Sequence, residues 1–131
     1  MQVEATQVFD TEELGMALAY LAGALPCKPR WIALATDEGR LLGQFQGKND
    51  GARIAALVRA TAALDGGLTL DGNGPFRCFV MLGADGAWLM LPLGESYRVY
   101  VAATNVRSLD AFVAAAREGL SPLRDVLGLS R

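Results

Sequence analysis

Residues 76–82 are apolar on both of the faces that an extended strand presents. Successive side chains of a strand point to opposite faces of the sheet. One face of this strand would carry Phe76, Cys78, Val80 and Leu82, and the other would carry Phe79 and Met81. Because Arg77 is the single polar residue of the run, neither face is suited to water. The sequence therefore predicts a sheet that helices cover on both sides.

Turn and capping signals divide the rest of the chain into helices and strands. Asp10 to Glu13 has the spacing of a capping box, and leucines follow at helical period until Pro26 ends the helix. Two short apolar runs, residues 31–35 and 41–45, flank a turn signal and predict a hairpin. A helix should follow from Asp50 onward.

Three strands are predicted in close succession in the second half of the chain, over residues 76–82, 87–93 and 97–103. Ser108 can cap a last helix, which Pro122 kinks or restarts. The predicted order is therefore α-β-β-α-β-β-β-α. At 131 residues, we expect a single domain over residues 1–131.

The predicted middle helix, from Asp50 to Asp65, has no obvious wet side. At about 100° per residue, one arc faces the sheet and holds Ile54, Leu57, Val58, Thr61 and Leu64. The remaining arc holds Arg53 and Arg59 and six alanines, Ala52, Ala55, Ala56, Ala60, Ala62 and Ala63. Alanine tolerates exposure in a helix, but six small side chains also permit another helix to approach closely. We favour a buried second face and a partner-dependent role, with the pair Gly66-Gly67 ending the helix.

Composition excludes several classes of partner. The formal net charge is -2 and the 12 basic residues are scattered along the sequence, so we expect no binding to nucleic acid. No apolar run approaches the roughly 20 residues of a membrane span, and residues 1–11 lack the pattern of an export signal. With two cysteines, a disulfide scaffold is not expected. These features predict a cytoplasmic protein without membrane insertion.

A search for catalytic chemistry finds almost nothing. The chain has no histidine, the commonest general base and transition-metal ligand. Cys78 alternates with core residues, and Cys27 has no base or orienting group suggested beside it. The segment from Gly43 to Lys48 has one residue too few for a phosphate-binding loop. We therefore expect no enzyme activity, no cofactor and no metal.

Three local patterns, in this order, resemble a roadblock (dynein light chain) domain. They are the hairpin from Trp31 to Gly43 with its Asp-x-Gly turn, the small-residue helix from Ala52 to Leu64, and the segment from Phe76 to Val101. The resemblance covers Leu14 to about Leu127. Ala33 departs from it, because many relatives have glycine at that position. The family includes bacterial regulators of Ras-like GTPases involved in gliding motility.

The resemblance implies a profilin-like α/β (α+β) sandwich with a five-stranded antiparallel sheet. The first and last helices would lie on one face and the middle helix on the other. It also implies a homodimer in which the middle helices pack side by side and the third strands pair across the two-fold axis. The dimer interface would then comprise Ala52, Arg53, Ala55, Ala56, Arg59, Ala60, Ala63, Phe76, Cys78 and Val80.

The function that the resemblance implies is binding without covalent chemistry. A dimeric platform would engage a small Ras-like GTPase, or scaffold a larger complex, and could stimulate hydrolysis by positioning the GTPase's own catalytic groups. Arg53 and Arg59 would contact a partner, at the rim rather than as arginine fingers. The alternative is a small-molecule sensor with a PAS- or profilin-like core. That function would require a closed pocket lined by Trp31, Trp88 or Tyr100.

Overall fold

The computed structural model describes residues 9–129, so most of the N-terminal stretch expected to lack an export signal lies outside the described residues. The elements in chain order are α1 (Thr11–Ala24), β1 (Lys28–Thr36), β2 (Leu41–Phe45), α2 (Gly51–Leu70), β3 (Phe79–Leu82), β4 (Ala87–Leu93), β5 (Tyr97–Thr104), α3 (Leu109–Gly119) and α4 (Ser121–Leu127). This order matches the predicted one, with the last helix in two pieces. Pro122 lies in the first turn of α4, as expected of a proline that restarts a helix.

The strands form one antiparallel sheet in the order β2-β1-β5-β4-β3. The predicted five-stranded antiparallel sheet is thus confirmed. β2 and β3 are its edges, and the long strand β5 lies at its centre. The register aligns Trp31 of β1, Ala102 of β5, Trp88 of β4 and Met81 of β3 in one row across four strands.

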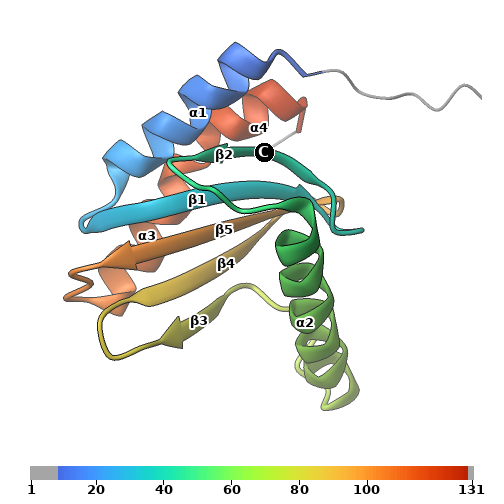
Figure 1. The fold of residues 1–131 in the computed structure, drawn as a ribbon. Helices are drawn as coiled ribbons and strands as arrows, with labels where there is room; N and C mark the ends of the chain where they lie inside the picture. Colours follow the sequence, from blue (N-terminus) through green and yellow to red (C-terminus); the bar gives the residue numbers. More distant parts are fainter. Residues whose placement is uncertain (1–8, 130–131) are drawn as a thin grey trace, which may run out of the picture.

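Helices cover both faces of the sheet, as both apolar faces of the strands predicted (Figure 1). α1, α3 and α4 lie on one face, where the larger core cluster includes Leu18, Leu34, Val101 and Phe112. α2 lies alone on the other face, over a smaller cluster that includes Ile54, Met90 and Tyr100. The expected placement of the first and last helices opposite the middle helix is confirmed.

The predicted end of α2 at Gly66-Gly67 is wrong, because the helix continues to Leu70. A glycine inside a helix costs about 1 kcal/mol relative to alanine, which tertiary contacts can offset. Leu68 packs on the smaller core cluster, and the helix ends where Gly72 adopts a φ of 81°. The turn signal that ends the helix is therefore the Asp71-Gly72 pair.

The third strand begins at Phe79, three residues later than predicted. The chain at Phe76 is held by α2 instead, since its backbone N–H donates a hydrogen bond of 2.8 Å to the Asp65 carboxylate. The Phe76 ring stacks on Phe79 at 4.7 Å, while Cys78 and Val80 pack against the opposite core cluster. The predicted sharing of one face by Phe76 and Val80 is therefore wrong.

Among the described residues, none of the helices combines the length and the apolar character needed to cross a bilayer.

Candidate partner-binding surface

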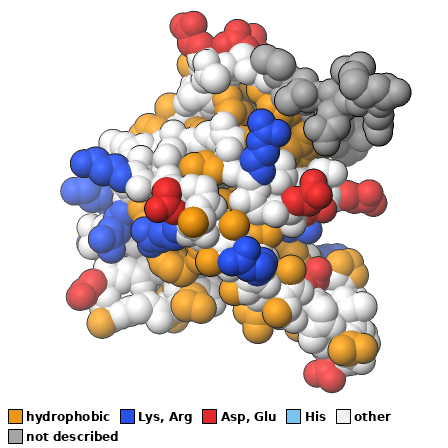
Figure 2. Space-filling view, turned by 45° about the vertical axis from the view of Figure 1, so that its right-hand side comes forward, with side chains coloured by type: hydrophobic (Ala, Val, Ile, Leu, Met, Phe, Trp, Pro, Cys, Tyr) orange, Lys and Arg blue, Asp and Glu red, His pale blue; other side chains and the backbone are white. Residues whose placement is uncertain are grey.

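Most of α2 faces away from its own sheet. Of its 20 residues, only Ile54 and Val58 are buried. The outer face of α2, defined here as Ala52, Ala56, Ala60 and Ala63, is exposed along the length of the helix. In Figure 2 the lower part of α2 projects at the lower right, with hydrophobic side chains in view. Leu64, predicted to face the sheet, is instead 53% exposed.

One cap and two polar contacts with the rest of the chain support α2 despite its small buried area. The Asp50 carboxylate caps the helix by accepting a 2.8 Å hydrogen bond from the N–H of Arg53. In the middle of the helix, the Thr61 hydroxyl lies 3.1 Å from the Tyr100 hydroxyl. Near the far end, Asp65 holds the backbone of Phe76. α2 is therefore capped at its start and joined to the rest of the fold at Thr61 and Asp65.

Ala55 differs from the other alanines predicted to form an interface. It is half-buried against the turn between β1 and β2, where Gly39 has a φ of 98°. A side chain at Gly39 would bring its Cβ to 3.0 Å from the Ala55 Cα, which is tighter than ordinary packing. Ala55 is therefore used for contacts within the chain, and the exposed stripe is made by its neighbours.

Arg53 extends over a pair of tryptophans. Its guanidinium lies 5.6 Å from the Trp31 ring centre and 6.0 Å from the Trp88 ring centre, and the two indoles meet edge-to-face at 6.2 Å. At these distances the positive charge is attracted to the faces of both rings. Arg59 is exposed. The two arginines singled out from the sequence thus differ, because Arg53 is engaged with its own sheet.

β3 contributes an open edge beside this surface. It is the last strand of the sheet, and the side chains of Met81 and Leu82 are 62% and 64% exposed. Of the residues predicted to form an interface here, Val80 and Cys78 are half-buried, whereas Phe76 is buried at 8% exposure. Sequence reasoning missed Met81 and Leu82 because alternation along a strand does not tell which of its side chains the other elements leave uncovered.

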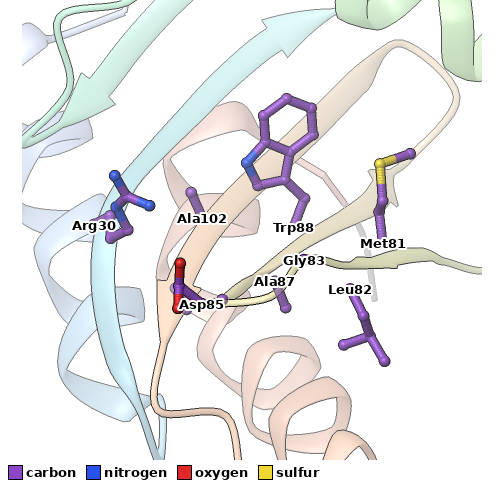
Figure 3. A pocket seen from close by; sticks show the side chains of 10 residues that line it. Arg30, Met81, Leu82, Gly83, Asp85, Ala87, Trp88 and Ala102 are labelled. Atoms are coloured by element: carbon purple, nitrogen blue, oxygen red, sulfur yellow. The ribbon is translucent and has the colours of Figure 1, made fainter.

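A shallow hollow of about 280 Å³ lies at the outer end of the β3–β4 hairpin (Figure 3). Arg30 and Asp85 lie at one side of it, and Trp88 and Met81 lie at the other. The hollow is open to solvent, and Tyr100 does not line it. It thus differs from the closed pocket that a small-molecule sensor would require.

Neither cysteine has the surroundings of a nucleophile. Burial raises the pKa of the Cys27 thiol above its ordinary value of 9.0, which lowers the fraction of reactive thiolate at neutral pH. Cys78 packs against the larger core cluster, where the sequence placed it. Within residues 9–129, no three side chains of the kinds that bind metals come together.

Comparison with known proteins identifies the fold. No protein-family model matches this sequence, and no protein of curated function matches it either. Solved structures do match: MglB of Myxococcus xanthus gives a TM-score of 0.76 at 17% identity, over 96% of this chain and 98% of its own. An MglB structure with a tetrameric arrangement gives 0.75 at 17% identity, over 95% and 96%. A Roadblock/LC7 domain from Streptomyces avermitilis gives 0.74 at 13% identity, over 87% and 97%. The chain has the roadblock fold.

The roadblock fold places the candidate surface on one side of the molecule. The outer face of α2 lies on the side opposite α1, α3 and α4, and the open edge of β3 ends the sheet (Figure 1). The resemblance drawn from the hairpin at residues 31–43 and the alanine-rich helix is confirmed at the level of the fold.

Proposed function

We propose that the protein is a non-catalytic regulatory and scaffolding module that acts as a homodimer and binds a small Ras-like GTPase. The observation that carries this proposal is that one domain has both an open strand edge, at β3, and a helix, α2, whose outer face carries small apolar side chains. The roadblock fold supports it, because the family includes regulators of Ras-like GTPases. A cytoplasmic location follows from such a partner.

Self-association would use β3 and the outer face of α2 together. Pairing of two β3 strands would satisfy the backbone groups of an edge that is otherwise open to any other strand. Burying a side chain such as Met81 or Leu82 stabilises an assembly by roughly 1.5–3 kcal/mol, so a few such contacts per chain suffice. Small residues at positions 52, 56, 60 and 63 would let two α2 helices approach closely. The tetrameric arrangement of one MglB structure is consistent with self-association in this fold.

The GTPase would bind on the α2 side of the dimer. Arg59 is exposed and therefore able to contact a partner, whereas Arg53 already lies over Trp31 and Trp88. An arginine finger would have to leave such a position to reach a nucleotide. We therefore propose that any effect on GTP hydrolysis comes from positioning the GTPase's own groups.

A binding titration tests the proposal directly. The full chain would be titrated against a small Ras-like GTPase from the same genome, loaded with GDP or with a non-hydrolysable GTP analogue. We expect saturable binding to at least one form, and about tenfold or greater weakening by Arg59→Glu, since a reversed charge at an interface costs both attraction and desolvation.

The matched control is Arg107→Glu, which makes the same charge change at an exposed position before α3. This variant should bind as the unmodified protein does. Absence of binding to every Ras-like GTPase of the genome would refute the proposed partner. Unchanged binding by Arg59→Glu would show that this part of α2 is not the docking site.

A further inference from the structure

β4 extends beyond its neighbour β3 and leaves part of its edge open. β3 pairs with β4 only from Ala87 to Met90, so Leu91, Pro92 and Leu93 have no partner in β3. Pro92 lacks a backbone N–H, as is common for a residue at an exposed sheet edge. A hollow of about 290 Å³ lies at this stretch, between β4, the segment before β3, and the helices α3 and α4.

The floor of this hollow is apolar. Leu91 and Leu120 are each 2% exposed, and Phe76 and Pro92 complete the apolar lining. Leu91 and Leu120 belong to the larger core cluster, so the floor is a fixed part of the fold. Because Leu91 and Leu120 expose almost nothing, an apolar side chain of a ligand would contact chiefly the half-buried Pro92.

The rim of the hollow is cationic. It carries Arg77 from the segment before β3, Arg117 from the last turn of α3 and Arg124 from α4. The Arg117 guanidinium donates a 3.2 Å hydrogen bond to the backbone carbonyl of Arg77 and so connects α3 to that segment. Arg98 lies nearby, with its guanidinium 5.6 Å from the Phe76 ring centre. Glu118 and Asp125, the acidic neighbours of Arg117 and Arg124 in sequence, do not line the hollow.

Three basic residues that are scattered along the sequence converge in the folded chain. Arg77 and Arg117 are 40 residues apart in sequence, and only the packing of α3 beside β4 brings them together. The chain has a net charge of -2, so a rim of three arginines is a local feature and not a consequence of a basic composition. The structure thus contains a cationic site that charge counting along the sequence could not find.

We propose that this arginine hollow, defined by Arg77, Arg117 and Arg124 over the Phe76–Leu91–Leu120 floor, binds an acidic peptide segment of a partner protein. Guanidinium groups bind carboxylates with two parallel hydrogen bonds, which favours a ligand bearing Asp or Glu. The apolar floor adds a requirement that a free inorganic anion cannot meet. The ligand is therefore a segment with an apolar side chain between acidic residues. This site lies apart from the outer face of α2 and does not depend on the GTPase assignment.

The test uses a fluorescein-labelled synthetic peptide with one phenylalanine flanked on each side by three acidic residues. We expect it to bind the full chain at low salt, and the double variant Arg117→Glu/Arg124→Glu to weaken binding about tenfold or more, because attraction becomes like-charge repulsion. Arg107→Glu, with a charge change outside the hollow, should bind as the unmodified protein does. A peptide with alanine in place of phenylalanine should bind more weakly.

A second measurement on the unmodified protein guards against a variant that fails to fold. Amide chemical shifts in a ¹⁵N spectrum should change on peptide addition around residues 76–79, 91–93 and 117–124. Changes confined to other regions, absence of peptide binding, or equal binding by all variants would overturn the proposal. Complete displacement of the peptide by millimolar inorganic phosphate would assign the site to small anions instead. A change in oligomeric mass caused by the double variant would assign the hollow to a second copy of the chain.

Discussion

At the scale of single residues, Arg53 is the side chain whose role the structure changes most. From the sequence it was a candidate partner contact on an alanine-rich helix. The structure shows its guanidinium near the rings of Trp31 and Trp88, which come from two strands separated by β5. The interaction connects the first turn of α2 to the sheet, one residue before the buried Ile54. Its first effect is therefore on stability.

Replacing Arg53 by alanine should lower the free energy of unfolding by about 0.5–1 kcal/mol, the value of a cation–π contact at an exposed site. Urea unfolding would measure the change, in an Ala56→Glu background so that subunit dissociation does not contribute. Arg59→Ala is the matched control, since it removes an exposed arginine from the same helix. An equal loss in both variants would mean that the tryptophan pair contributes nothing.

Tyr100 makes a second prediction at this scale. Burial raises the pKa of its phenol above the ordinary value of 10.0, and the Thr61 hydrogen bond and the charge of Arg98 offset part of that rise. The folded protein therefore keeps this proton at a pH where the unfolded chain has lost it. Stability is fully present below about pH 10 and declines as the pH rises above the unfolded pKa.

Tyr100→Phe should flatten this alkaline decline, as measured by urea midpoints between about pH 8 and about pH 11. Burial also raises the pKa of Cys27, but that thiol titrates in both proteins, so the difference between them isolates Tyr100. Parallel declines in the two proteins would rule out a coupled phenol. At neutral pH the variant should be less stable by about 1 kcal/mol, because the bond to Thr61 is lost.

At the scale of elements, α2 is a long helix although its sequence contains two residues that disfavour helix formation. Gly66 and Gly67 lie inside it, and a Cβ added at either would meet no atom within 4 Å. Gly66→Ala should therefore stabilise the protein by about 0.5–1 kcal/mol, because alanine loses less backbone entropy on folding. Gly72→Ala should destabilise it, since that residue has a φ of 81°. Thermal unfolding of the two variants checks both signs, and destabilisation by Gly66→Ala would contradict the helix end placed at Leu70.

Elements also differ in how far their sequence predicts them. The Asp10 cap, the bounds of β2 and β4 and the break at Pro122 follow local rules and are confirmed. The start of β3 does not follow a local rule, because the contacts of Phe76 with Asp65 and Phe79 outweigh the strand pattern of its sequence. Such a contact joins residues brought together only by the folded helix. The alternation of side chains along the sequence therefore does not predict this contact.

At the scale of the whole molecule, strand order decides which surfaces are free. The pairing of β1 with β5 places β3 at an edge, and no periodicity in the sequence specifies that pairing. The resemblance to roadblock domains implied only that the third strand lies at an edge. No periodicity in the sequence predicts the arginine hollow either, because its three arginines lie in the segment before β3, in α3 and in α4. The candidate surface was half-predicted: the exposed alanines were named, whereas Met81 and Leu82 emerged only from the fold.

We propose that the outer face of α2 and the edge of β3 join two copies of the chain. Light scattering of the unmodified protein at micromolar concentration should give twice the 13.9 kDa of one chain. Ala56→Glu should reduce this to the mass of one chain while leaving the circular dichroism spectrum unchanged, because Ala56 is exposed and buries nothing in its own fold. Ala114→Glu, at an exposed position of α3, should remain a dimer. A monomeric unmodified protein, or a dimer that survives Ala56→Glu, would contradict the claim.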